Sequence, residues 1–133
     1  MLPHDWRYPR AVGRPTEGEA ATLEVTVTPD MTARLFGREV HPVYATAWMV
    51  RHVEESGRLV VERSLGEGED ATGYRIELTH ERPARVGDRL TISARVVRAD
   101  DSECVTDHEV TGPSGIIGRA RFVQRYVDRG LGR

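Results

Sequence analysis

The 133-residue sequence contains no lysine and no asparagine, and all 19 of its basic residues are arginines. The absence of lysine excludes catalysis through a lysine Schiff base. A single cysteine, Cys104, cannot form an internal disulfide or supply the cysteine pairs of a zinc site. The histidines His4, His41, His52 and His108 show no metal-ligand spacing. We therefore expect no metal and no bound cofactor.

The 19 basic and 21 acidic residues leave a formal net charge of −2, which argues against a nucleic-acid partner. The chain is 38% hydrophobic and 30% charged, as in a globular domain rather than a disordered or membrane protein. No apolar run approaches the ~20 residues of a membrane span, and the N-terminus lacks a signal-peptide pattern. A cytoplasmic protein with no membrane partner is the expectation.

The length fits one domain, which we expect over residues 19–128. Residues 1–18 carry three prolines and no periodicity, so they are interpreted as an irregular N-terminal arm. Trp6 and Tyr8 in this arm are candidates for packing on a partner subunit. Residues 129–133 are expected to form a loose tail.

Alternating apolar and polar residues predict strands at residues 22–28, 58–65, 73–80, 89–99, 103–111 and 116–127. Residues 44–56 predict the one helix, and Gly57 is the expected stop. This order predicts an α+β fold, with a largely antiparallel six-stranded sheet packed on a single helix. So small a core favours dimerisation.

The predicted helix places a hydroxyl and a carboxylate beside an apolar stripe. Thr46, Met49, Val50 and Val53 share that stripe at 100° per residue. Glu54 lies at its edge, about 80° around the helix from Thr46. The alternative interpretation is that Thr46 caps the helix and Glu54 is a solvated surface acid.

The predicted strand at residues 73–80 ends on His80, which alternation places on the same apolar face as Tyr74. His80 is either a half-buried structural histidine or a proton-transfer group whose pKa suits general base catalysis. A Thr, Glu and His set supports acyl transfer. The carboxylate attacks or activates water, the imidazole moves protons, and the hydroxyl holds a reacting group.

Other polar residues are weaker candidates. His52 is predicted on the polar side of the helix, and His108 is interpreted as an exposed strand residue. Arg119, Arg121 and Arg125 alternate on one face of the last strand. These arginines either form a solvated sheet face or meet a phosphate-rich cofactor.

Two segments together resemble the hot-dog-fold thioesterases related to fluoroacetyl-CoA thioesterase. Residues 43–54 read V-Y-A-T-A-W-M-V-R-H-V-E and match the segment that opens the central helix in that family. Residues 73–80, G-Y-R-I-E-L-T-H, match the following strand, and residues 86–91, V-G-D-R-L-T, continue the order. The resemblance covers residues 22–127.

The resemblance implies a hot-dog fold, an antiparallel sheet wrapped around one central helix. It implies a homodimer that hydrolyses an acyl-CoA thioester to free acid and CoA, with Thr46, Glu54 and His80 as catalytic residues. The backbone N–H of Gly73 would be an oxyanion contact. An arginine of the final strand contacts substrate in the family, with Arg121 the first choice here.

Arg125 is the alternative to Arg121 as the substrate contact. Residues 35–42 form a shorter connection than the aromatic lid of the fluoroacetyl enzyme, so a different small or medium acyl group is expected. One alternative function is a hot-dog enoyl-CoA hydratase or dehydratase, although the helix lacks the Asp such enzymes use. Another is a non-catalytic protein that binds acyl-CoA or a small apolar ligand. The sequence leaves open whether Glu54 attacks directly or through water.

Overall fold

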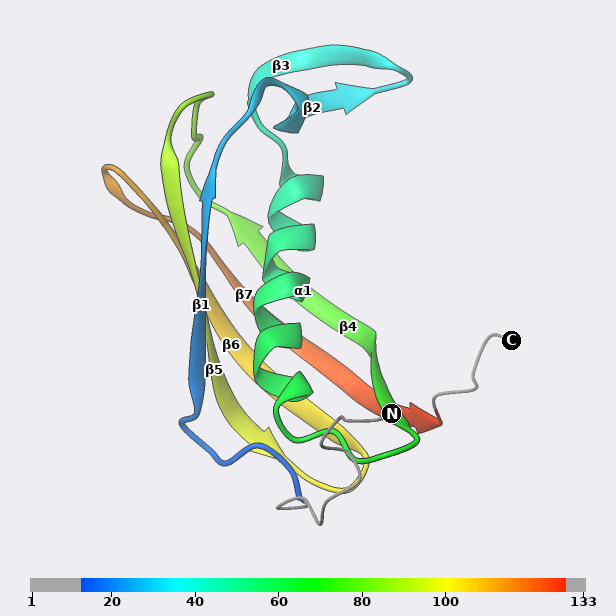
Figure 1. Cartoon of the computed structure of the whole chain (residues 1–133). Coiled ribbons are helices and arrows are strands. Elements are labelled where there is room, and N and C mark those ends of the chain that lie inside the picture. Colours follow the sequence, from blue (N-terminus) through cyan, green and yellow to red (C-terminus); the bar gives the residue numbers. More distant parts are fainter. Residues whose placement is uncertain (1–12, 129–133) are drawn as a thin grey trace, which may run out of the picture.

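The computed structural model describes residues 13–128 and consists of an antiparallel sheet with one long helix across it (Figure 1). The sheet order is β1-β5-β6-β7-β4. Its strands are β1 (Ala20–Thr26), β5 (Arg89–Ala99), β6 (Glu103–Gly112), β7 (Gly115–Asp128) and β4 (Glu69–His80). The helix is α1 (Thr46–Glu62). The predicted α+β class and single helix are confirmed.

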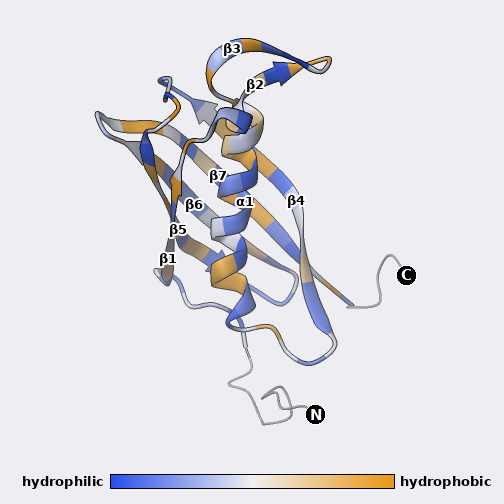
Figure 2. Ribbon diagram, turned by 45° about the horizontal axis from the view of Figure 1, so that its top comes forward, coloured by the Kyte–Doolittle hydropathy of each residue, from blue (hydrophilic) through white to orange (hydrophobic). Residues whose placement is uncertain are grey.

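Alternation of side chains explains how the sheet meets the helix. Along β5, Leu90, Ile92, Ala94 and Val96 are at most 1% exposed, whereas the residues between them face outward. Figure 2 shows this banding of hydrophobic and hydrophilic residues along the strands. Burying one apolar face of a sheet under a helix is the standard way for such a pattern to form a core. The other face of the sheet carries the charged residues.

The helix is longer than predicted, and the strand expected at residues 58–65 is wrong. Helix α1 continues through Gly57, where a side chain would lie 2.9 Å from the ring of Phe122 on β7. Glycine costs about 1 kcal/mol in a helix, but it permits this close approach. Val60 and Val61 are then fully buried and extend the apolar stripe. The main sheet therefore has five strands rather than six.

A small hairpin lies before the helix, in a segment where the sequence analysis predicted a short connection and no strand. A short 3-10 helix, η2 (Pro29–Met31), leads into β2 (Thr32–Leu35), which pairs with β3 (Arg38–Tyr44). The turn uses two residues with positive φ, Phe36 at 56° and Gly37 at 79°. Two such residues match the tight turns that join hairpin strands. In Figure 1 the hairpin extends beyond the N-terminal end of α1.

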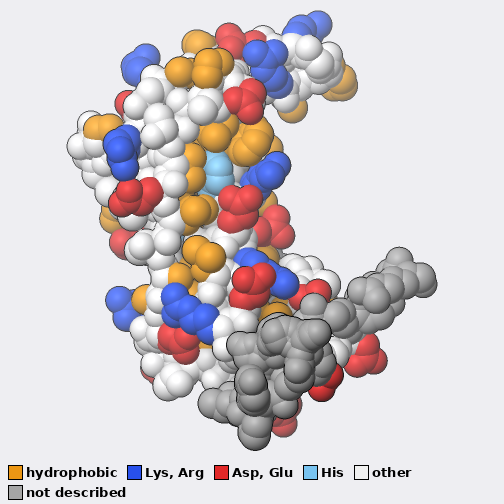
Figure 3. Space-filling model, viewed as in Figure 1, with side chains coloured by type: hydrophobic (Ala, Val, Ile, Leu, Met, Phe, Trp, Pro, Cys, Tyr) orange, Lys and Arg blue, Asp and Glu red, His pale blue; other side chains and the backbone are white. Residues whose placement is uncertain are grey.

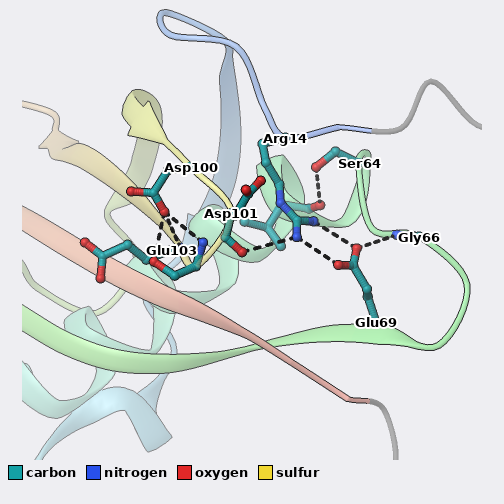
Figure 4. A network of polar contacts seen from close by, with 9 residues as sticks. Arg14, Ser64, Gly66, Glu69, Asp100, Asp101 and Glu103 are labelled. Carbon is teal, nitrogen blue, oxygen red and sulfur yellow. Dashed lines mark hydrogen bonds and ion pairs between the residues drawn. The ribbon is translucent and has the colours of Figure 1, made fainter.

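The described part of the N-terminal arm contacts the end of the molecule opposite the β2–β3 hairpin. Both guanidinium nitrogens of Arg14 donate to the Glu69 carboxylate, at 2.9 and 2.8 Å, and the guanidinium lies 3.7 Å from the ring centre of Tyr126. Figure 4 shows Arg14 reaching Glu69 and the backbone carbonyl of Asp101. The arginine lowers the pKa of the Glu69 carboxyl. The expected contacts of Trp6 and Tyr8, and the expected tail at 129–133, lie outside the described residues.

No helix within residues 13–128 combines the length and the apolar character needed to span a bilayer. Helix α1 has 17 residues and carries arginine and glutamate side chains along its exposed side. Figure 3, which views the molecule from the helix side, shows these charged groups beside hydrophobic ones.

Candidate active site

Thr46 and His80 meet where the helix begins and strand β4 ends. Thr46 is the first residue of α1, and its hydroxyl lies 2.9 Å from the His80 Nδ1. The helix N-cap is Ala45, which makes no side-chain cap, so Thr46 does not serve as the cap. In Figure 1 the start of α1 and the end of β4 both lie in the upper half of the molecule. The structure thus joins two of the three predicted catalytic residues.

The surroundings of His80 favour its neutral form. Burial lowers the pKa of the imidazole, and the backbone of Arg82 partly opposes this effect. The other ring nitrogen, Nε2, is buried and has no hydrogen-bond partner within residues 13–128. The Tyr44 ring contacts the imidazole edge to face, with centroids 6.0 Å apart. A neutral imidazole with one free nitrogen can accept a proton.

Glu54 lies beside Gly73 of strand β4. A Cβ on Gly73 would be 2.9 Å from the Glu54 Oε2 and 3.2 Å from the Phe122 ring, so a larger residue here would displace the end of the Glu54 side chain. Glu54 is exposed and forms no hydrogen bond or ion pair with any residue in 13–128. The predicted oxyanion contact and the predicted acid are therefore neighbours.

The three predicted catalytic groups do not converge within one chain. Thr46 and Glu54 are eight residues apart on the helix, which corresponds to about 12 Å along its axis. Gly73 and His80 are seven residues apart on β4, or roughly 23 Å along an extended strand. A glutamate side chain is too short to cross this distance. Within one chain these groups therefore form two separate pairs, Thr46 with His80 and Glu54 with Gly73.

A groove of about 310 Å³ surrounds the Glu54 and Gly73 pair. Its remaining lining residues are Arg51, Glu55, Arg58, Ala71, Phe122 and Gln124. Arg51 pairs with Glu55 at 3.3 Å, and Arg58 pairs with Asp70 at 2.7 Å. The groove is thus lined by Ala71, Gly73, Phe122 and Gln124 on the sheet and by charged side chains on the helix. Among the described residues, Glu54 is the carboxylate of this groove that forms no ion pair.

Arg121 and Arg125, expected to contact substrate, lie on the face of the sheet turned away from α1. Arg121 forms a two-bond ion pair with Asp107, at 2.8 and 3.0 Å. The Arg125 guanidinium lies 3.7 Å from the ring centre of Tyr74. Neither arginine reaches the groove, because residues facing the groove alternate with them along β7.

Gln124 is the polar residue of β7 that faces the groove, and the sequence analysis missed it. It is 3% exposed, and its Nε2 donates to the carbonyl of Gly57 at 3.2 Å. Tyr74 also departs from the prediction. A bulge between Gly73 and Arg75 leaves it 58% exposed instead of on the face of His80.

His52 is buried, in contrast to the predicted solvated position. It is 4% exposed, and its Nδ1 lies 2.6 Å from the Tyr44 hydroxyl. The buried helix face contains Met49, His52, Val53, Ser56, Gly57, Val60 and Val61. Including Val60 and Val61 in the apolar stripe would have placed His52 on that face.

His108 is also buried rather than exposed, at 3%. Its Nδ1 lies 2.9 Å from the Ser56 hydroxyl and its Nε2 2.7 Å from the Thr106 hydroxyl. Ser56 donates to the carbonyl of Val53, so it accepts a hydrogen bond from His108 Nδ1–H. Burial lowers the pKa of His108 to about 4. This histidine links α1 to β6 inside the core.

Comparison with known proteins assigns the chain to a family. A family model described as fluoroacetyl-CoA-specific thioesterase matches residues 27–130. The chain belongs to this family. Among curated proteins, none matches the chain.

Solved structures show the same fold. A hypothetical protein of Thermus thermophilus, described as a thioesterase superfamily member, is 36% identical over 86% of this chain and 85% of its own, with a TM-score of 0.82. The fluoroacetyl-CoA thioesterase FlK is 21% identical over 85% of this chain and 88% of its own, with a TM-score of 0.76. A hot-dog-like protein from Thermanaerovibrio acidaminovorans is 20% identical over 86% of this chain and 85% of its own, with a TM-score of 0.79. The predicted hot-dog fold and the predicted thioesterase family are confirmed.

Proposed function

We propose that this protein is an acyl-CoA thioesterase that works as a homodimer and hydrolyses a small or medium acyl-CoA thioester to free acid and CoA. The observation that supports this best is the 2.9 Å contact between Thr46 and His80, in a chain of a thioesterase family. The substrate class suggests a cytoplasmic enzyme, because acyl-CoA thioesters are made and used there.

Strand β4 offers the surface for dimerisation. It is a 12-residue strand at the edge of the sheet, and within residues 13–128 it pairs with β7 alone. A long unpaired edge presents backbone N–H and C=O groups to another chain. Antiparallel pairing of two β4 strands about a two-fold axis at Glu77, with the bulge between Gly73 and Arg75 counted as one strand position, sets Gly73 opposite His80 of the partner subunit.

This pairing completes the site. Opposed residues of an antiparallel pair have Cα atoms about 4.5–5.5 Å apart. Because Glu54 lies on Gly73, it would lie next to the imidazole of His80 of the partner subunit. Each dimer would then have two sites, each with Glu54 from one chain and the Thr46–His80 pair from the other.

Hydrolysis at such a site follows from the three groups. In one route the Glu54 carboxylate takes a proton from water as the water oxygen attacks the thioester carbonyl carbon. The C–S bond then breaks, and the proton passes through His80 to the CoA sulfur. In the other route Glu54 attacks the carbonyl itself and releases CoA thiolate, and water then cleaves the resulting anhydride. Thr46 holds the His80 ring by its hydrogen bond in both routes.

The substrate differs from fluoroacetyl-CoA in this proposal. FlK acts on fluoroacetyl-CoA, but in the present chain the segment before the helix forms the short β2–β3 hairpin. The aromatic residue at its turn, Phe36, is 96% exposed. On the sheet side the groove at Glu54 is lined by Ala71, Gly73 and Phe122 with the single amide of Gln124, a mainly apolar lining that suits a small acyl group.

Release of free CoA from a panel of short, medium and aromatic acyl-CoA thioesters tests the proposal. Glu54→Gln and His80→Gln should each lower kcat by about a hundredfold or more. Glu55→Gln is the matched control, because Glu55 is the next helix residue and lines the same groove. It should stay within about threefold of the wild type.

Absence of CoA release across the whole panel would exclude the thioesterase. Loss of absorbance of the enoyl thioester with crotonyl-CoA, without CoA release, would instead indicate the hydratase. A co-purified acyl-CoA that is neither hydrolysed nor hydrated would indicate the non-catalytic binding protein.

A further inference from the structure

A buried aromatic pair, Tyr44 and His52, lies behind the candidate proton-transfer residue His80. Tyr44 is 1% exposed and His52 is 4% exposed. The two rings are stacked, with an interplanar angle of 8° and centroids 5.8 Å apart, and the Tyr44 hydroxyl bonds to His52 Nδ1 at 2.6 Å. Neither residue belongs to the predicted catalytic set, so the pair needs another explanation.

The contacts form a closed ring that starts and ends on α1. Thr46 on the first turn bonds to His80, and the Tyr44 ring meets the His80 imidazole edge to face at 6.0 Å. The far end of Tyr44 is then fixed by His52, which lies six residues after Thr46 on the same helix. The backbone of Tyr44 is also fixed, because its N–H donates to the carbonyl of Ala84 at 2.9 Å. The tyrosine ring is therefore held from three sides.

A catalytic histidine normally has a third group that fixes its orientation, most often a carboxylate. Within residues 13–128 the Thr46 hydroxyl is the side-chain hydrogen-bond partner of the His80 ring, and the backbone of Arg82 also acts on it. Neither partner is a carboxylate. Packing must therefore help to fix the imidazole plane, and Tyr44 is the aromatic ring that meets the imidazole edge to face.

We propose that Tyr44 is the positioning residue of His80, and that His52 holds Tyr44 in place through the tyrosine hydroxyl. The aromatic ring acts as a wall that fixes the imidazole plane and excludes water from it. The hydroxyl contributes to stability, because both partners of this buried bond would otherwise be unsatisfied. This role depends on the proposed function for its catalytic meaning, but the effect on His80 itself does not.

The groups that face His80 within its own chain are few and uncharged, so a change in its pKa can be attributed to the loss of the Tyr44 ring. Thr46 comes from α1, Tyr44 from β3, and Gly118 is opposite on β7. The neighbouring Glu81 is paired with Arg119 at 2.7 Å and accepts a hydrogen bond from Thr79, which alternates with His80 along β4. His52 faces Tyr44 rather than His80. In the proposed dimer Glu54 of the partner subunit would also lie next to the imidazole, and it is unchanged in every variant compared below.

The experiment compares Tyr44→Leu and Tyr44→Phe in the full-length protein by two measurements. The first is the pKa of His80 from NMR titration, with the resonance assigned by its loss in His80→Gln. The second is the pH profile of kcat for CoA release. Tyr44→Leu admits water to the imidazole, so the His80 pKa should rise toward its ordinary value, about 6.5. The acidic limb of kcat should move to higher pH by the same amount, because the neutral imidazole is the active form.

Tyr44→Leu should also lower kcat by about tenfold or more while KM stays within about threefold. Tyr44→Phe keeps the ring, so it should preserve the His80 pKa and most of kcat while lowering the melting temperature. Tyr126→Leu is the control for a tyrosine lost at the far end of the molecule. It should lower stability without moving the titration of His80.

An unchanged His80 pKa and acidic limb in Tyr44→Leu would overturn the proposal. So would an equal shift in Tyr44→Phe, because the ring would then have no role of its own. If the wild type releases no CoA but the NMR shift appears in Tyr44→Leu alone, the proposed function fails and the positioning role stands.

Discussion

The contact between Glu54 and Gly73 is the close approach at the candidate site that a single substitution tests at the scale of residues. The carboxylate oxygen occupies the space where any other residue would carry its Cβ. The sequence predicted both residues as parts of a site, but only their coordinates show that they touch. Periodicity gives the angle of a residue around a helix and says nothing about which strand lies under it.

Gly73→Ala tests this contact. The added methyl group would lie 2.9 Å from Glu54 Oε2 and 3.2 Å from the Phe122 ring, so the carboxylate must move. We expect kcat for CoA release to fall about tenfold or more, because a displacement of about 1 Å is costly in catalysis. The fold should survive, since Gly73 has an ordinary φ. Gly66→Ala is the comparison, because its added methyl group would lie 3.4 Å from the Glu69 Oε1. Equal rates for Gly73→Ala and the wild type would show that the contact is not used.

The buried His108 makes a second prediction at this scale. Its pKa of about 4 in the folded state is below the ordinary value of about 6.5 in the unfolded chain. The unfolded state therefore binds more protons between these values, and stability falls as the pH drops through this window. The slope for one such group is at most about 1.4 kcal/mol per pH unit.

Urea unfolding of the wild type and His108→Gln at pH 7, 5.5 and 4.5 measures this effect. His52 and His80 have lowered pKa values too, so they remain as background in both proteins. The wild type should lose more stability than the variant over this range. Parallel losses would show that His108 does not titrate as described.

At the scale of elements, strand β5 was predicted with its observed bounds, because strict alternation and polar turns define both of its ends. The end of α1 was not. Gly57 carries a local signal for stopping, but burial of Val60 and Val61 outweighs it. The β2–β3 hairpin was also missed. Most of its residues are exposed, so it lacks the apolar alternation from which strands are recognised.

Alanine substitutions at adjacent positions test the extended helix. Val60 is fully buried and Leu59 is 40% exposed. Val60→Ala should lower the free energy of unfolding by about 2 kcal/mol through the cavity that it leaves. Leu59→Ala should change it by about 0.5 kcal/mol or less. Denaturant unfolding of the two variants gives the comparison, and similar losses at both positions would contradict the helical register.

At the scale of the whole molecule, each chain holds two half-sites, Thr46 with His80 and Glu54 with Gly73. Their separation explains why the sequence identified the reactive residues but not how they meet. The residues of each half-site come from distant segments that the fold brings together. The halves themselves lie about 12 Å apart along α1. In the proposed dimer a second chain paired along β4 brings the two half-sites together. The residue pattern of one chain does not indicate how two chains pair.

Mixing two inactive variants tests this account most directly. Glu54→Gln and His80→Gln are unfolded together in equal amounts and refolded, so that about half of the dimers contain one chain of each kind. In the proposed dimer, such a heterodimer has one site with both Glu54 and His80 intact. The mixture should recover about a quarter of the wild-type rate of CoA release, since each variant alone has lost its general acid–base group. A mixture as inactive as its two components would contradict the shared site.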